Sequence, residues 1–200
     1  MGGPLITILT PTRHRPLAVL ERCVTSVNRQ TLLDWLHLIC SDGQQEPAVE
    51  EFVRQEHDER RRCLYLTPPR GHYGAGVRAA LLDRVQTPYV AFLDDDNVLF
   101  PRFCEDMTQT LSEHPEAGWA ICQILHCGPL HPRFGLPPAV LTGIPPVPAN
   151  IDTLQVVART DVIRQSGWVL NGYLSDGATY EKLAKSSPWI AVDEVLGAHV

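Results

Sequence analysis

The feature that most constrains the fold of this chain is a fourfold alternation of short apolar runs with amphipathic segments across residues 1–113. The β-rich apolar runs predict strands at 5–9, 36–40, 63–66 and 88–93. Apolar residues at helical spacing predict helices over 16–30, around 49–53, over 74–85 and from Pro101 onward. This alternation predicts an α/β fold with a mostly parallel sheet and helices on both faces. We expect the first strand to end at Pro11.

The second half of the chain has a less regular pattern. Strands are expected at 117–125, 154–158 and 190–196, and helices from about 161 and over 176–185. Residues 128–150 contain seven prolines, which exclude a regular helix or a central strand there. We expect this segment to be a long ordered loop with a functional role.

Composition limits the classes of function. The chain has 200 residues, of which 44% are hydrophobic, and a formal net charge of −6. A single domain spanning residues 1–200 is therefore expected, and general nucleic-acid binding is disfavoured. Arg60, Arg61 and Arg62 form a short basic cluster, which we interpret as the solvated end of a helix. Six cysteines without a CxxC pair, no signal peptide and no long apolar run predict a cytoplasmic protein without a transmembrane segment.

Three consecutive carboxylates, Asp94, Asp95 and Asp96, directly follow the last of the four apolar runs. Unpaired charges are too costly to bury, so these side chains are expected next to a cation. A hard divalent ion, Mn²⁺ or Mg²⁺, prefers oxygen ligands and can hold a diphosphate. The alternative is a solvated acidic turn. Residues 10–13 and Asp42 also follow predicted strands, and ligands of parallel α/β sheets bind beyond these strand ends.

Five segments, taken in order, resemble the motifs of the family 2 glycosyltransferases, and the resemblance covers nearly the whole chain. The segments are Thr7–Arg13, Ser26–Thr31, Ile39–Gly43, Gly74–Arg78 and Ala91–Asp96. The last of them matches that family's A-F-L-D-x-D motif. The resemblance implies a GT-A fold in which residues 1–113 bind the nucleotide sugar. It implies that residues 114–200 bind the acceptor and supply the catalytic base.

The resemblance also assigns candidate site residues. Those for the nucleotide sugar are Pro11, Thr12, Arg13, Asp42, Gly74, Arg78, Asp94 and Asp95. Those for a divalent metal are Asp94, Asp96 and His199, and the candidate catalytic base is Asp176. Two positions depart from the family's pattern, because Ser41 and Ser175 stand where an acidic residue usually precedes Asp42 and Asp176.

Several of these residues keep an alternative interpretation. Asp42 can belong to a plain Asp-Gly turn, Asp176 can begin a helix, and His199 can lie in a frayed terminus. Trp168 and Tyr173 are either core side chains or an aromatic platform for an acceptor sugar.

The expected function is metal-dependent, inverting transfer of a sugar from a nucleoside diphosphate sugar to an acceptor hydroxyl. A UDP-sugar is favoured, because the aspartate corresponding to Asp42 often contacts uracil in the resembling family. One alternative is a sugar nucleotidyltransferase, which residues 10–15 disfavour because they lack the Gly and Lys of a phosphate-binding signature. The other is a nucleotide-sugar-binding module with a degenerate site. The acceptor alternatives are a glycan, a lipid-linked sugar and a small metabolite.

Overall fold

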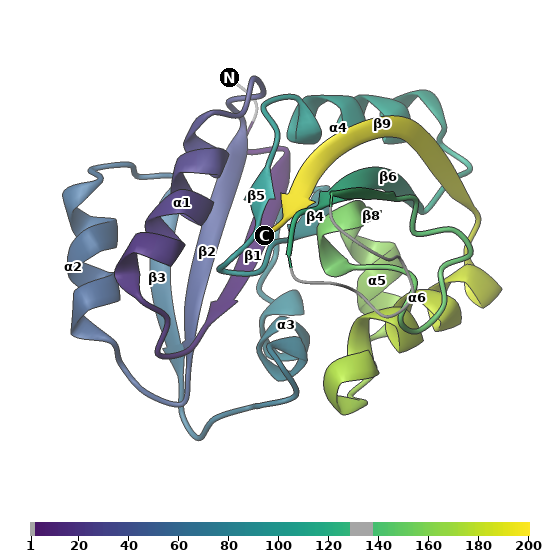
Figure 1. Ribbon diagram of the computed structural model, residues 1–200. Coiled ribbons are helices and arrows are strands. Elements are labelled where there is room, and N and C mark those ends of the chain that lie inside the picture. The colour runs from purple at the N-terminus through teal and green to yellow at the C-terminus, as the bar shows by residue number, and fades with distance from the viewer. Residues whose placement is uncertain (1–2, 129–137) are drawn as a thin grey trace.

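Four parallel strands form one half of the central sheet in the computed structural model, which describes residues 3–128 and 138–200 (Figure 1). They are β1 (Ile6–Thr12), β2 (Trp35–Asp42), β3 (Arg61–Leu66) and β4 (Tyr89–Phe92), lying side by side in the order β3-β2-β1-β4. The helices between them are α1 (Leu17–Asn28), α2 (Pro47–Gln55) and α3 (Ala75–Leu82). The predicted alternation of strands and helices is therefore confirmed in this half.

The other half of the sheet is mixed and continues in the order β4-β8-β6-β9-β5. Its elements are β5 (Val98–Leu99), α4 (Phe103–Glu113), β6 (Trp119–His126), β7 (Ala139–Leu141), η1 (Thr153–Gln155), β8 (Val156–Arg159), α5 (Thr160–Ser166), η2 (Gly172–Leu174), α6 (Ser175–Ser186) and β9 (Trp189–His199). Strand β8 runs antiparallel to both β4 and β6, whereas β9 runs parallel to β6. The short strands β5 and β7 were not predicted, because two or three residues carry no periodicity. Part of the proline-rich segment, 129–137, lies outside the described residues.

Two sequence predictions were wrong in detail. Strand β1 does not end at Pro11 but includes it, opposite Cys40 of β2. Strand β4 pairs with β1 only as far as Leu9, so beyond that point β1 has a single neighbour and tolerates a residue without an N–H. The basic cluster is not a helix end, because Arg61 begins β3 and is buried, donating to the Nδ1 of His37 at 3.2 Å.

Strand β9 lies between β6 and the edge strand β5. Figure 1 shows it arching past α4 and β6, with the C-terminus next to the label of β5. His199 pairs with His126 of β6, and its carbonyl accepts the N–H of Cys127 at 2.7 Å. The Oδ1 of buried Asn97 accepts the N–H of Val200 at 3.3 Å. His199 therefore lies in a paired strand rather than in a frayed terminus.

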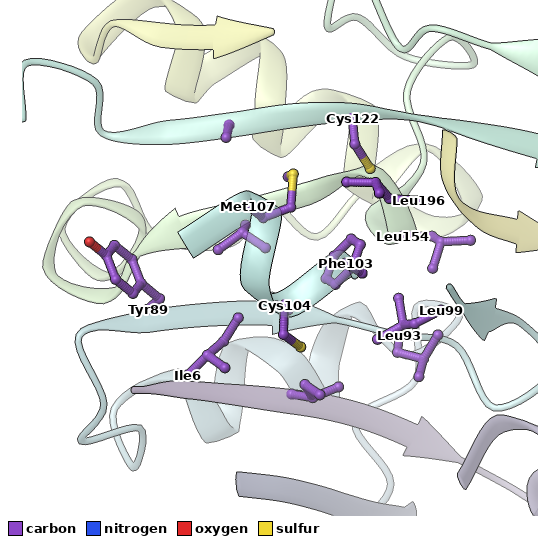
Figure 2. Close-up of a cluster of buried hydrophobic side chains, with 14 of the residues drawn as sticks. Ile6, Tyr89, Leu93, Leu99, Phe103, Cys104, Met107, Cys122, Leu154 and Leu196 are labelled. Carbon is purple, nitrogen blue, oxygen red and sulfur yellow. The ribbon is translucent and has the colours of Figure 1, made fainter. Parts of the chain in front are cut away.

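Apolar side chains cover both faces of the sheet. On one face, Figure 2 shows Phe103 and Met107 of α4 among buried side chains of the strands, and α1 packs against the same cluster. On the other face, α3, α5 and α6 contribute buried residues that include Leu81, Ile163 and Tyr180. This doubly covered sheet holds the strand ends rigidly at one edge. Within the described ranges, no helix is long and apolar enough to cross a membrane.

Candidate active site

A cleft lies beyond the carboxyl ends of β1, β2 and β4, and it consists of two adjoining pockets. The larger has a volume of about 540 Å³ and the smaller about 160 Å³. Both are lined by Tyr73, Asp94, Tyr173 and His199. The cleft gathers most of the sequence-predicted site residues: Pro11, Thr12, Arg13, Asp42, Gly74, Asp94, Asp95, Asp96 and His199 line the larger pocket, and Arg78 and Asp176 line the smaller.

The three consecutive aspartates have different environments. The Asp95 side chain is only 6% exposed, and its two oxygens accept from the Thr12 hydroxyl at 2.7 Å and the Arg15 Nε at 2.8 Å. The side chains of Asp94 and Asp96 are 36% and 34% exposed and line the pocket. Asp95 and Asp96 lie in a turn that the N–H of Asn97 closes on the carbonyl of Asp94 at 3.1 Å, and this turn points successive side chains in different directions. Asp95 therefore ties the end of β1 to the end of β4, while its neighbours face the cleft.

Two arginines partly neutralise the exposed pair. The buried guanidinium of Arg78 contacts the Oδ1 of Asp94, and the Nη2 of Arg15 lies 3.0 Å from the Oδ2 of Asp96. Burial raises the pKa of Asp96, against the opposing effect of Arg15. Burial alone would lower the pKa of Arg78, but the charges of Asp94 and Asp176 outweigh it and raise that pKa. The cleft therefore contains carboxylates and guanidinium groups in direct contact with one another.

Thr12, the last residue of β1, and Arg13, the next residue, have different surroundings. Arg13 is exposed and lines the larger pocket, so it can meet a phosphate from solvent. Thr12 is buried, and its hydroxyl donates to Asp95, so this side chain has a structural contact. Arg15, rather than Arg13, is the arginine that contacts the aspartates.

Asp42 fixes the loop that follows β3 and lines the larger pocket. Its two carboxylate oxygens accept the backbone N–H groups of Arg70 at 2.6 Å and Gly71 at 2.8 Å. It is thus more than part of a local Asp-Gly turn, since it anchors a loop 28 residues away. At the end of this loop, Gly74 approaches Pro11 so closely that a Cβ would lie 2.8 Å from the proline Cγ. The contact of Asp42 with a base stays a prediction.

His199 forms a pair with a second histidine that sequence reasoning missed. The Nδ1 atoms of His126 and His199 lie 3.1 Å apart, and the rings stack with centroids 5.1 Å apart. Strands β6 and β9 bring them together through their register. Both imidazoles line the smaller pocket with Asp94. Only the parallel pairing of these strands could have revealed His126, because 73 residues separate the two histidines.

Asp176 lies in the first turn of α6 and lines the smaller pocket. Burial, and then the nearby charge of Asp152, raise the pKa of its carboxyl to about 7, although Arg78 acts in the opposite direction. The pKa of Asp152 is also raised, first by burial and then by Asp94. A carboxyl that gains its charge near neutral pH is suited to accept a proton from a hydroxyl. Asp152 lines the same smaller pocket as Asp176.

The two candidate aromatic residues are separated by the fold. Trp168 packs against Phe92 and Tyr180, with ring centroids 4.6 Å and 5.9 Å away, so it belongs to the core side of the cleft. Tyr173 is 73% exposed and meets Tyr73 at the mouth of the cleft. Of the alternatives left open by the sequence, Trp168 therefore takes the core position and Tyr173 the surface one.

Three side chains in the larger pocket have the chemistry of metal ligands. They are those of Asp94, Asp96 and His199, whose carboxylate oxygens and imidazole nitrogen are ligand types that Mn²⁺ binds. The raised pKa of Asp96 means that its charged form is destabilised, and a bound cation would stabilise that form. Within residues 3–128 and 138–200, however, no three His, Cys, Asp or Glu side chains are grouped closely enough to ligate one ion. The metal role of these residues stays a prediction.

Comparisons with known proteins place the chain in a well-defined group. A family profile described as Glycosyl transferase family 2 matches residues 7–137. The succinoglycan biosynthesis protein ExoW of Rhizobium meliloti is 34% identical over 98 residues, which cover 48% of this chain and 30% of that protein. The chain thus spans less than a third of the length of this curated relative.

Solved structures share the fold at low sequence identity. The crystal structure of S. aureus TarS matches with a TM-score of 0.79 and 12% identity, covering 98% of this chain and 36% of the TarS chain. The mannosyltransferase PcManGT from Pyrobaculum calidifontis, in complex with GDP-Man and Mn²⁺, matches with a TM-score of 0.75 and 14% identity over 99% of this chain and 57% of its own. These similarities show that the fold is GT-A-like.

Proposed function

This chain belongs to glycosyl transferase family 2, and from that premise we propose that it transfers a sugar from a nucleoside diphosphate sugar to an acceptor hydroxyl, with inversion at the anomeric carbon. The observation that carries the proposal is the junction of two pockets at the edge of the sheet. The larger is lined by Asp94 and Asp96, and the smaller, which shares Asp94, is lined by Asp176.

The larger pocket is proposed to bind the donor. The exposed guanidinium of Arg13 supplies a fork for phosphate, and the backbone after Pro11 approaches the same space. The Asp42 carboxylate accepts the N–H groups of Arg70 and Gly71, so the part of the pocket lined by residues 71–74 is preorganised. In this proposal residues 1–113 form the donor-binding half of a single domain. Residues 114–200 form the half that binds the acceptor and supplies the base.

Asp176 is proposed as the catalytic base. Its carboxylate removes the proton of the acceptor hydroxyl while that oxygen attacks the anomeric carbon from the face opposite the leaving group. The new bond joins the acceptor oxygen to the anomeric carbon, and the bond from this carbon to the phosphate oxygen breaks. The nucleoside diphosphate leaves with the bonding electrons. Arg78, which is buried between Asp94 and the smaller pocket, favours the charged form of Asp176.

Asp94, Asp96 and His199 are proposed to hold Mn²⁺ or Mg²⁺. A divalent ion bound there would neutralise the charge that grows on the departing nucleoside diphosphate. Arg78 contacts Asp94 and Arg15 contacts Asp96, so these two arginines hold the carboxylates in the cleft.

The nucleotide is proposed to be a uridine diphosphate. Structures of TarS in complex with UDP and UDP-GlcNAc match this chain with a TM-score of 0.75. PcManGT binds GDP-Man, so guanosine diphosphate is the first competitor to be tested.

The experiment is thermal unfolding of the purified chain with UDP, GDP, ADP and their sugars, with Mn²⁺ or with EDTA. A nucleotide at one hundred times its dissociation constant stabilises the folded state by about 2.7 kcal/mol. For a domain of this size, that corresponds to a rise of roughly 5–10 °C in the unfolding temperature. We expect this rise with UDP or a UDP-sugar, only when Mn²⁺ is present, and slow hydrolysis of the same donor.

Matched variants make the test specific. Asp94→Asn and Asp96→Asn should remove the Mn²⁺-dependent rise. Asp83→Asn makes the same chemical change at a side chain that is 85% exposed on the surface and should leave the rise unchanged. No rise with any nucleotide would overturn the proposal. A nucleotide-sugar that binds without hydrolysis or transfer would instead support a binding module with a degenerate site.

A further inference from the structure

Two large aromatic side chains stand exposed at the mouth of the cleft. Tyr73 is 77% exposed and Tyr173 is 73% exposed, although a packed core lies close by. Their rings meet edge to face, with centroids 5.7 Å apart and planes at 86°. The pair joins segments that are 100 residues apart in the chain. Exposed aromatic rings that border a pocket, rather than scattered singly, point to a ligand.

The backbone holds Tyr73 in an unfavourable conformation. Four successive residues have φ in the left-handed region: Gly71 (66°), His72 (56°), Tyr73 (54°) and Gly74 (85°). Glycine adopts such angles freely, but histidine and tyrosine do so at an energetic cost. The surrounding contacts enforce the turn, since Asp42 accepts the N–H of Gly71 and the N–H of Gly172 donates to the Nδ1 of His72 at 3.4 Å. This turn therefore destabilises the folded state while it keeps the Tyr73 ring outside the core.

The position of the pair relates it to the chemistry of the cleft. Both tyrosines line both pockets, so they lie where the proposed donor and the proposed acceptor meet. The smaller pocket continues from them to Asn150, Asp152 and Asp176. It thus combines exposed aromatic rings with amide and carboxylate groups. A sugar ring has the matching surface, since its C–H face packs on aromatic rings and its hydroxyl groups bond to amides and carboxylates.

We propose that Tyr73 and Tyr173 form the acceptor subsite, and that the acceptor presents a sugar ring to these side chains. The inference rests on the proposed function and narrows it, because it selects a saccharide, free or at the end of a larger glycan, over a small metabolite without a sugar. The tyrosine rings hold the acceptor sugar so that one of its hydroxyl groups faces the carboxylate of Asp176.

The test measures saccharide binding by saturation-transfer NMR. The probes are the methyl glycosides of glucose, galactose, mannose, N-acetylglucosamine and rhamnose, added to the chain with UDP and Mn²⁺. We expect at least one probe to bind, and its affinity to fall about tenfold in Tyr73→Ala and in Tyr173→Ala. Tyr73→Phe and Tyr173→Phe should retain the affinity, because they keep the ring. Tyr65→Ala removes a tyrosine that is 51% exposed on β3, outside both pockets, and should have no effect.

The outcomes separate this inference from the proposed function. If UDP with Mn²⁺ raises the unfolding temperature of every variant equally while no probe binds, or while all variants bind the probe alike, the acceptor subsite is overturned and the proposed function survives. If the alanine variants lose UDP affinity instead of saccharide affinity, the tyrosines bind the nucleotide and the inference is also overturned. If no nucleotide raises the unfolding temperature of the unsubstituted chain, the proposed function itself fails.

Discussion

Replacing Asp95 by alanine should destabilise the fold far more than replacing its neighbour Asp96. The two residues are adjacent in a run of three aspartates, but the Asp95 side chain is 6% exposed and that of Asp96 is 34% exposed. Asp95 accepts from the hydroxyl of Thr12 and from Arg15, which are more than 75 residues away in the sequence. The Asp96 carboxylate lies 3.0 Å from the Arg15 Nη2, and the Arg22 Nη2 donates to the backbone carbonyl of Asp96 at 2.7 Å, a contact that does not need the Asp96 side chain.

The magnitude follows from these contacts. A buried hydrogen bond to a charged group contributes about 1.5–3 kcal/mol, which applies to the bond between Thr12 and Asp95. The bond from Arg15 adds at most about 1 kcal/mol, because the Arg15 side chain is 38% exposed and solvent screens it. Asp95→Ala should therefore cost about 2–4 kcal/mol. Asp96→Ala removes only a partly exposed ion pair and should cost less than about 1 kcal/mol.

Urea unfolding followed by circular dichroism measures the difference. With a slope of about 2 kcal/mol per molar urea, Asp95→Ala should lower the unfolding midpoint by roughly 1–2 M, and Asp96→Ala by less than about 0.5 M. Thr12→Val provides the partner for a double-mutant cycle with Asp95→Ala. The cycle should give a coupling energy of about 1–2 kcal/mol, since the two side chains touch.

Two results would refute this reasoning. Equal midpoints for Asp95→Ala and Asp96→Ala would mean that the buried aspartate does not tie the ends of β1 and β4 together. A coupling energy near zero in the cycle would mean that the bond between Thr12 and Asp95 contributes nothing to stability, whatever the single variants show.

Three further predictions concern the cleft. The raised pKa of Asp176, about 7, means that the folded state binds a proton between about pH 4 and 7 that the unfolded state has released, so stability should fall as pH rises through this window. Asp176→Asn should remove the loss of stability that the titration of Asp176 causes, measured by unfolding at several pH values. The same variant should lower turnover by about 10²–10⁴ without changing donor affinity. Lost donor affinity at unchanged turnover would contradict its role as base. In Gly177→Ala the new Cβ would lie 2.3 Å from the Cα of Pro148, so the variant should lose about 1–3 kcal/mol in urea unfolding, and an unchanged midpoint would contradict this close packing. His126→Ala should raise the Mn²⁺ concentration required for half-maximal activity about tenfold, because its ring orients His199; an unchanged requirement would exclude this support.

Local patterns were sufficient to predict the half of the fold with four parallel strands. The four apolar runs became β1 to β4 because each is a contiguous stretch whose burial depends mainly on its own composition. The strand-end positions of Asp42 and of residues 94–96 followed directly, since the carboxyl ends of parallel strands share one edge of the sheet. The order of the motifs also identified the family before any contact was known.

Two strands of the mixed half could not be predicted without the tertiary structure. The two strands β5 and β7 are too short to have a period, and they exist because neighbouring strands offer unpaired backbone groups. In the parallel half, the burial of Arg61 likewise depends on His37 and Asn28, which lie on other elements. A run of three arginines by itself is more typical of a solvated surface.

The order of apolar runs and motifs was enough to predict the class of fold, the edge of the sheet where the cleft lies and the carboxylates that line it. The packing of the elements was required to show which of the three aspartates is buried, that His126 meets His199, and that Tyr73 contacts Tyr173 at the mouth of the cleft. Each of these contacts joins side chains more than 70 residues apart in the chain. Hydrophobic periodicity reports only which face of one element is buried, whereas such contacts depend on how several elements pack against one another.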